Sequence, residues 1–214
     1  MIKFLTKRKS VFFVAFLFFG NIMMVDFNFL IMGYFDQPNE KHKVFLSYYH
    51  NDDQWYKDRI EDLFGHLFIN KSVQDGDIDT DVSTEYIKQL IQSDDYLANA
   101  SVLIVLCGPN TLGRKHVDWE ISGALNKKVG GYSGIIGILL PEFPLTPDGK
   151  YDYSDIPARL ADNVKTGFAE IYTWRYITDA SKFTDVIERA FKRRTAIELI
   201  DNNRPQMQRN TSGL

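Results

Sequence analysis

Glu120 is the clearest candidate for a catalytic side chain in this chain of 214 residues. It lies in the segment RKHVDWEISGAL, where His116 precedes it by four residues and therefore shares its face of a helix. Val117 and Ile121 define the adjoining apolar face, so Glu120 is predicted at the edge of the core, where it could point over the strand ends into a crevice. The alternative is a solvated glutamate that pairs with His116 or Lys127.

Further candidates stand at the ends of apolar runs that are typical of buried strands. Ser47, Tyr48 and Tyr49 end the run KVFLSYY, and Cys107 follows SVLIVL. Ligands of open parallel sheets bind outside the carboxyl ends of the strands, so these residues are predicted around the same crevice. Cys107 is either a nucleophile or a small buried hydrophobe, and His50 is either a proton carrier or a surface loop residue.

Several function classes are excluded by what the sequence lacks. It has no G-x-G-x-x-G, no G-x-x-x-x-G-K-[ST] and no G-x-S-x-G motif. One cysteine and four scattered histidines rule out a disulfide framework and argue against a metal centre. A net charge of −3 gives no basic balance for nucleic-acid binding. The aspartates of residues 75–81 resemble a calcium loop but lack its Gly and Glu, so an exposed turn is the simpler interpretation.

Strands alternate with helices along the rest of the chain. Strands are predicted at 43–48, 68–73, 101–106, 134–140 and 169–172, and helices at 54–67, 83–92, 114–128, 156–163 and 181–199. Asn51, Asp52 and Asp53 are N-cap candidates for the first of these helices. The pattern predicts a flavodoxin-like, doubly wound, parallel five-stranded sheet of order 2-1-3-4-5 with helices on both faces. Residues 74–83 are placed at the rim of the crevice, where they could act as a lid.

The first 31 residues form a separate hydrophobic segment. They carry Lys3, Lys7, Arg8 and Lys9 against Asp26, a net charge of 4 − 1 = +3. No small-x-small site follows the apolar run, which argues against a cleaved signal peptide. The segment is a membrane anchor, an artefact upstream of a natural start at Met32, or something else, and membrane contact is predicted only through residues 10–31. The main domain is predicted at 42–175, a C-terminal helix at 176–200 and a disordered tail at 201–214.

Three stretches together resemble a known family. KVFLSYYHNDD, SVLIVLCGPNTLGRKHVDWEISGAL and GIIGILL are similar to TIR-like domains, and among them to the ThsB family of Thoeris anti-phage systems, over roughly residues 42–175. In that family a Trp often stands four residues before the glutamate that matches Glu120. Here the position holds His116, and Trp119 is directly beside the acid instead.

The resemblance implies a function. Such domains consume NAD⁺ as a substrate, not as a cofactor, and release nicotinamide with an ADP-ribose or cyclised product, as an NAD⁺ nucleosidase or ADP-ribosyl cyclase does. The product is a nucleotide signal for a separate effector. By this resemblance Glu120 is catalytic, while Ser47, Tyr48, Tyr49 and His116 bind substrate, without a metal. The resemblance also implies self-association, and NAD⁺ as substrate implies a cytoplasmic location.

Two other functions fit the same residues. The domain could be a non-catalytic module that docks a second TIR-like domain, with Glu120 in a structural role. It could also be similar to nucleoside deoxyribosyltransferases, which use a glutamate on an α/β scaffold. Release of nicotinamide from NAD⁺ separates the first enzyme from both alternatives.

Overall fold

The computed structural model describes residues 13–18, 21–26, 41–72, 97–128 and 130–211 of the chain. The chain divides into two compact units, Met1–Glu40 and Lys41–Leu214, and each is described by itself. The predicted helix at 83–92, the acidic turn at 75–81 and the proposed lid at 74–83 lie outside the described residues.

The first unit contains a pair of strands. β1 (Phe13–Phe18) runs antiparallel to β2 (Asn21–Asp26), with Phe13 opposite Asp26. Both strands lie within the hydrophobic segment of the sequence. Among the helices in the described ranges, none is long and apolar enough to span a bilayer.

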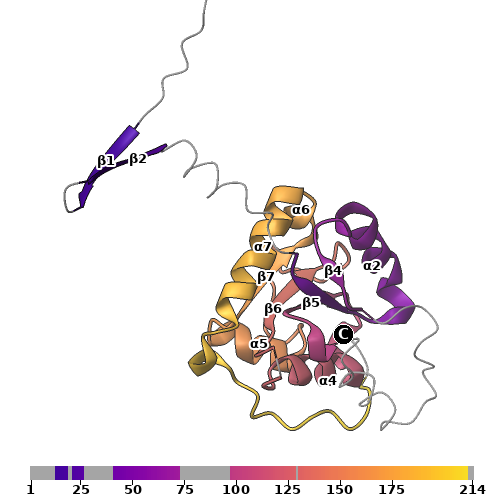
Figure 1. Ribbon diagram of the computed structural model, residues 1–214. Coiled ribbons are helices and arrows are strands. Elements are labelled where there is room, and N and C mark those ends of the chain that lie inside the picture. The colour runs from indigo at the N-terminus through magenta and orange to yellow at the C-terminus, as the bar shows by residue number, and fades with distance from the viewer. Residues whose placement is uncertain (1–12, 19–20, 27–40, 73–96, 129, 212–214) are drawn as a thin grey trace, which may run out of the picture. The chain divides into compact units, whose positions relative to one another are not determined.

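The second unit is built on a parallel sheet whose strands follow the order β4-β3-β5-β6-β7 (Figure 1). Its strands are β3 (Lys43–Ser47), β4 (Ile69–Asn70), β5 (Val102–Cys107), β6 (Gly134–Leu139) and β7 (Ala169–Thr173). Every neighbouring pair is parallel. This is the predicted order 2-1-3-4-5, and the doubly wound α/β fold is confirmed. β5 and β6 are buried along their whole length, as expected for central strands covered on both faces.

Helices cover both faces of the sheet. They are α2 (His50–Phe64), α4 (Lys115–Ala124), α5 (Ala158–Lys165), α6 (Trp174–Ile177) and α7 (Ala180–Arg193), with short 3-10 turns at Leu97–Asn99, Thr111–Gly113 and Ile197–Leu199. Side chains of α4 and α5 form one hydrophobic cluster with the sheet, and side chains of α2 and α7 form the other. Apolar residues alternate between the clusters along β3, β5, β6 and β7, so the sheet has two buried faces.

The first strand decides which residues share a face. Phe45 belongs to the cluster of α4 and α5, while Leu46 and Tyr48 belong to the cluster of α2 and α7. Successive strand residues point to opposite faces, so Ser47 points to the same face as Phe45, toward α4. Gly134 lets α7 lie directly on β6, because a Cβ there would be 1.9 Å from the carbonyl oxygen of Ala190.

Two predicted elements are shorter in the structure. The second strand spans Ile69–Asn70 where residues 68–73 were predicted, because only these two residues pair with β3 in the described part of that range. The last helix ends at Arg193, since the chain turns there, and only a 3-10 turn lies at Ile197–Leu199.

The first helix has Tyr49 as its N-cap residue, with no capping side chain, so the N-cap expectation for residues 51–53 is wrong.

The prediction of a disordered tail is wrong for residues 201–211. These residues, which we call the C-terminal strap, run past α5 and then α4 and are drawn in yellow in Figure 1. Polar composition suggested disorder, but the strap meets buried polar partners on both helices, among them Asp118, Arg159 and Asn163. Hydrogen bonds to those partners replace the apolar burial that the segment lacks.

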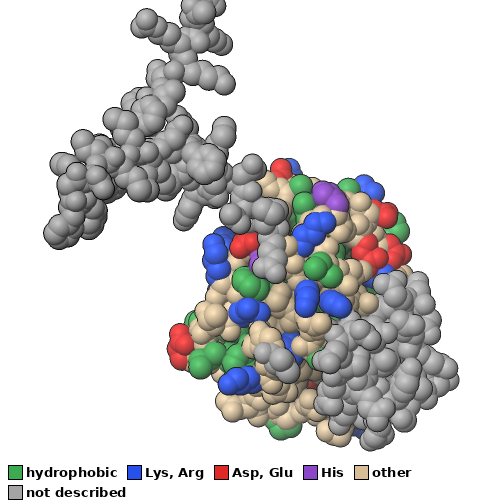
Figure 2. Space-filling model, in the orientation of Figure 1, with side chains coloured by type: hydrophobic (Ala, Val, Ile, Leu, Met, Phe, Trp, Pro, Cys, Tyr) green, Lys and Arg blue, Asp and Glu red, His purple; other side chains and the backbone are tan. Residues whose placement is uncertain are grey.

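Two basic residues of α7 lie close to an acid of the sheet. Arg193 reaches back to β7, where its Nη2 lies 2.6 Å from Oε1 of Glu170, and Arg189 lies near the same carboxylate. The face shown in Figure 2 has Lys and Arg side chains interspersed with Asp and Glu. The basic face of α7 is therefore partly neutralised by its own domain.

Candidate active site

Glu120 is a buried carboxylate at the carboxyl end of the sheet. It lies in the second turn of α4 and is 4% exposed, so the alternative of a solvated glutamate is wrong. Ser47, at the end of β3, is 1% exposed and points to the face that α4 covers. Ser47 Oγ and Glu120 Oε2 have no hydrogen-bond partner among the described residues. Buried polar atoms are rarely left without a partner, so these two atoms need an explanation, and a bound ligand is one of them.

The environment of Glu120 disfavours its charged form. Burial raises the pKa of its carboxyl to about 8, and the neighbouring hydroxyl of Ser47 offsets part of that rise. Without a ligand the side chain is therefore mostly protonated at neutral pH. A bound cation would favour the carboxylate, which suits a site where positive charge develops.

His116 bonds to β3 and does not pair with Glu120. Its Nε2 lies 3.1 Å from the carbonyl oxygen of Tyr48, so this nitrogen carries the proton and donates it. Burial lowers the pKa of His116 to about 4, although the bond to Tyr48 opposes that shift. A neutral His116 thus links the first turn of α4 to the end of β3, next to the ring of His50, whose centroid is 6.0 Å away.

The two tyrosines of the predicted set lie elsewhere. The ring of Tyr48 packs on the α2 side of the sheet, and its hydroxyl donates to Gln54 Oε1 at 2.7 Å. Tyr49 precedes α2, and the guanidinium of Arg114 lies 4.1 Å from its ring centroid. The structure therefore gathers Ser47, His116 and Glu120 on one side of β3, where Tyr48 contributes its carbonyl group and not its ring.

Cys107 is a buried thiol at the end of β5. It is 0% exposed, and burial, with the nearby charge of Asp53, raises its pKa far above the usual range. A nucleophilic cysteine needs a stabilised thiolate and access to solvent. Of the two interpretations of Cys107, the small buried hydrophobe fits this environment.

Asp53 is a second buried carboxylate, which the sequence suggested only as an N-cap. Its Oδ2 accepts a hydrogen bond of 3.0 Å from the hydroxyl of Thr111, whose oxygen accepts the N–H of Gly108 at 2.9 Å. Gly108 has to be glycine, because a Cβ there would be 2.4 Å from Asp53 Oδ1. This chain of contacts joins α2 to the loop after β5, across the switch point of the sheet. In the sequence, the cluster of acidic residues after β3 is the one signal that could have identified Asp53.

Replacement of Asp53 by Asn is expected to stabilise the domain near neutral pH. Burial raises the pKa of Asp53 to about 6, with the bond from Thr111 opposing, so the folded state loses stability as pH rises toward 6. Asn still accepts the Thr111 bond but carries no charge. We expect a gain of about 1 kcal/mol at pH 7, since solvent screening reduces the full effect, and none at pH 4. Urea unfolding at both pH values measures it.

The matched control is Asp52→Asn. Asp52 is exposed and accepts a hydrogen bond from Asn110 at the surface, so the same chemical change should leave stability almost unchanged. Two outcomes would show that ionisation of buried Asp53 does not destabilise the fold. One is an equal effect of the two substitutions, and the other is a loss of stability from Asp53→Asn at pH 7.

A buried ion pair was missed in the sequence. Asp118 stands two residues before Glu120, and its Oδ1 accepts a hydrogen bond of 2.9 Å from Nε of Arg159, which is 1% exposed. The pair joins α4 to α5. No motif marks it, because the two residues are far apart in sequence and each resembles an ordinary surface charge.

Sheet order and site together define the class. A parallel sheet of order 2-1-3-4-5 with a buried acid on the helix after the third strand fits a TIR-like α/β domain, although other flavodoxin-like domains share this order. Residues 45–143 match the family model of the Thoeris protein ThsB, TIR-like domain, and this segment is a TIR-like domain of that kind. The resemblance drawn from the sequence is confirmed.

Comparison with whole proteins adds less. None of the curated proteins matches the chain. Among solved structures, the TIR domains of the activated Roq1 resistosome, which directly recognises the pathogen effector XopQ, are 12% identical, with a TM-score of 0.37 over 75% of this chain and 86% of that chain. The sheet order and the family match, not this distant likeness, define the domain.

Proposed function

We propose that the domain cleaves NAD⁺ between nicotinamide and ribose and makes an ADP-ribose-type signal in Thoeris defence. One observation carries the proposal: the carboxyl group of Glu120 is buried next to Ser47 at the carboxyl end of the sheet, and its Oε2 has no hydrogen-bond partner among the described residues. The large majority of buried side-chain oxygens with a structural role have a hydrogen-bond partner. The family match supports a role in the same defence system.

One carboxylate suffices for this bond. The glycosidic bond breaks through a transition state in which the ribose resembles an oxocarbenium ion. Nicotinamide leaves the cationic pyridinium as a neutral molecule, so no general acid has to protonate it. Glu120 would bind the ribose hydroxyls and stabilise the positive charge as it develops, which is worth most in a site shielded from water.

The neighbours of Glu120 have positioning roles in this scheme. The hydroxyl of Ser47 can donate to the carboxylate or accept from a ribose hydroxyl, and it has no other partner among the described residues. Neutral His116 fixes the first turn of α4 to the carbonyl of Tyr48. Both contacts reduce the freedom of the reacting groups, a large part of catalysis in such reactions.

The ribose oxocarbenium ion can react with either of two nucleophiles. Water adds hydroxide to the anomeric carbon and releases a proton, which gives ADP-ribose. An adenine nitrogen of the same molecule can form the new bond instead, which gives a cyclic product. Either product would serve as a signal to a separate effector, and self-association of the domain would complete the pocket.

The test is to incubate the full-length chain with NAD⁺ and analyse the small molecules by mass spectrometry. Nicotinamide together with ADP-ribose or a cyclic isomer is the expected result. Protein concentration is varied widely, because activity that depends on assembly rises more steeply than concentration. Absence of nicotinamide at every concentration, from a folded protein, would leave the docking role as the better account.

The rate should also depend on pH. Catalysis needs ionised Glu120, and its pKa in the free protein is about 8. We therefore expect kcat/KM to rise about tenfold per pH unit up to about pH 8 and then to level off. Nicotinamide release measured between about pH 6 and pH 9, with blanks for chemical breakdown of NAD⁺, checks this.

His116 and Asp53 can be separated from Glu120 in that experiment. His116, with a pKa of about 4, is neutral throughout and adds no step. Asp53, with a pKa of about 6, is removed by Asp53→Asn, which should leave the step near pH 8 in place. A flat profile in both proteins would contradict a carboxylate mechanism at Glu120.

A further inference from the structure

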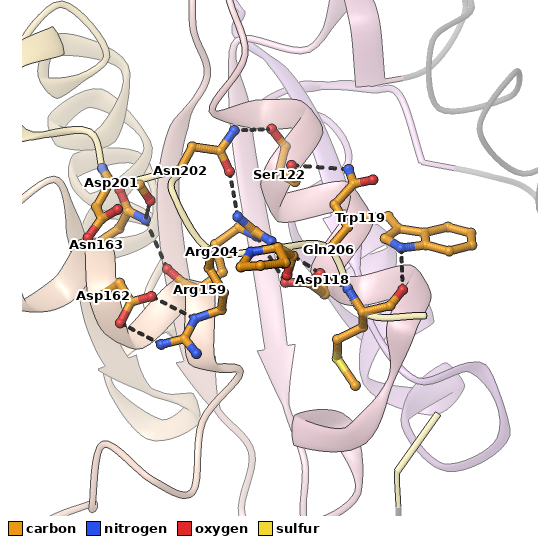
Figure 3. Close-up of polar contacts among 12 residues, drawn as sticks. Asp118, Trp119, Ser122, Arg159, Asp162, Asn163, Asp201, Asn202, Arg204 and Gln206 are labelled. Atoms are coloured by element: carbon orange, nitrogen blue, oxygen red, sulfur yellow. Dashed lines mark hydrogen bonds and ion pairs between the residues drawn. The ribbon is translucent and has the colours of Figure 1, made fainter. Parts of the chain in front are cut away.

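We infer that the C-terminal strap, residues 201–211, is a positioning element that holds α4 in place and thereby keeps Glu120 against β3. The inference rests on the proposed function of Glu120. Figure 3 shows strap residues facing α4 on one side and α5 on the other. Contacts along the length of α4 carry the inference.

The strap supplies the N-terminal cap that α4 lacks. The residue before the helix, Arg114, makes no side-chain hydrogen bond to the first turn. Instead, Oδ1 of Asn210 accepts the N–H of Lys115 at 3.0 Å, and the N–H of Thr211 donates to the carbonyl of Gly113 at 2.9 Å. A Cβ at Gly113 would be 2.4 Å from the carbonyl oxygen of Thr211, so this close approach requires glycine.

The backbone of Met207 binds the two residues that directly precede Glu120. Its N–H donates to Oδ2 of Asp118 at 2.8 Å, and its carbonyl accepts the indole N–H of Trp119 at 2.9 Å. One turn further, Gln206 donates to the hydroxyl of Ser122 at 3.2 Å. The strap thus contacts α4 from its first residue to its third turn.

The other side of the strap is fixed to α5. Asn163 of α5 exchanges hydrogen bonds with the backbone of Asp201, at 2.7 Å and 3.1 Å. Arg159 binds Oδ1 of Asn202 at 2.7 Å and the carbonyl of Pro205 at 3.2 Å while it pairs with Asp118. The buried guanidinium therefore ties strap, α5 and α4 together.

These contacts act from behind the catalytic side chain. Two residues along a helix are about 200° apart around its axis, so Asp118 and Glu120 point in nearly opposite directions. Asp118 faces the strap, and Glu120 faces β3. The strap therefore does not line the substrate site, and its effect on Glu120 passes through the position of the helix.

The test compares the full chain with two variants that loosen the strap from α4. One is the double substitution Asn210→Ala with Gln206→Ala, which removes two polar side chains that bind α4 and leaves the hydrophobic core intact. The other is a chain that ends at Arg204. The controls are a chain that ends at Thr211 and Arg204→Gln, which breaks the half-exposed bond of the strap to Asp162 on α5.

Three readouts are expected to change together in the loosened variants. kcat for nicotinamide release should fall about tenfold while KM changes little, because a small displacement of a catalytic group costs chemistry more than binding. The pH midpoint of kcat/KM should fall by about one unit, as solvent reaches Glu120. Backbone amides of residues 115–124 should exchange hydrogen faster, with those of β5 unchanged. The controls should match the full chain.

The outcomes separate this inference from the proposed function. An unchanged kcat, pH midpoint and amide exchange in both loosened variants would overturn the positioning role, whatever the reaction is. If the shortened chain does not fold, the double substitution decides alone. If the full chain releases no nicotinamide, the proposed function fails, and amide exchange in α4 still shows whether the strap holds the helix.

Discussion

Glu120→Gln is expected to abolish nearly all nicotinamide release while the protein stays folded. Gln keeps the size and burial of the side chain but has no negative charge to stabilise the ribose cation. Loss of one such electrostatic group typically costs about 10²–10³-fold in kcat, and we expect at least that. The measurement is single-time-point and steady-state release of nicotinamide from NAD⁺ by the full chain.

The same substitution should raise the stability of the domain. Burial raises the pKa of Glu120 above its unfolded value, so the folded state loses stability as pH rises toward about 8. A neutral Gln avoids that loss, and the midpoint of thermal unfolding at pH 8 should increase. The matched control is Glu198→Gln on the exposed 3-10 turn, which should change neither property. Unchanged turnover in Glu120→Gln would remove the enzymatic proposal.

Arg159→Met is expected to cause the largest loss of stability among the charged residues described. It leaves the carboxylate of Asp118, whose side chain is 6% exposed, without its cation and removes the bonds to Asn202 and Pro205. Breaking one partner of a buried ion pair costs about 3–5 kcal/mol, because the remaining charge stays buried. Urea unfolding, followed by far-ultraviolet circular dichroism, gives the difference in the free energy of unfolding.

Two comparisons make this result specific. Arg204→Met breaks the ion pair with Asp162, in which Arg204 is 45% exposed, and should cost at most about 1 kcal/mol. Combining Arg159→Met with Asp118→Asn should cost less than the sum of the two single changes, since it removes both charges. A cost for Arg159→Met no greater than that for Arg204→Met would show that the buried pair does not stabilise the fold.

The sheet could be predicted from the sequence because its signal is local. Unbroken apolar runs such as SVLIVL and GIIGILL identify central strands, and helical spacing of apolar residues identifies the helices between them. Glu120 and Ser47 could be predicted together, because the carboxyl ends of neighbouring parallel strands meet at one edge. The orientation of Tyr48 follows from strand alternation once the register is known.

The strap and the buried ion pair could not be predicted in this way. The strap sequence DNNRPQMQRNT has few apolar residues and no period, which is also the composition of a disordered tail. Its order depends on partners far away in the chain, such as Lys115 for Asn210 and Asp118 for Met207. Asp53 was hidden for a related reason: its burial follows from the position of Thr111, on another loop.

The N-terminal cap that the strap supplies to α4 has a consequence for biosynthesis. Every described strand and helix of the second unit precedes the strap in the chain, so all of them leave the ribosome before Asn210 does. A nascent domain could thus assemble its sheet while its glutamate-bearing helix is still unsecured. If the proposed function holds, NAD⁺ cleavage by such a copy would be about tenfold slower than by a finished one.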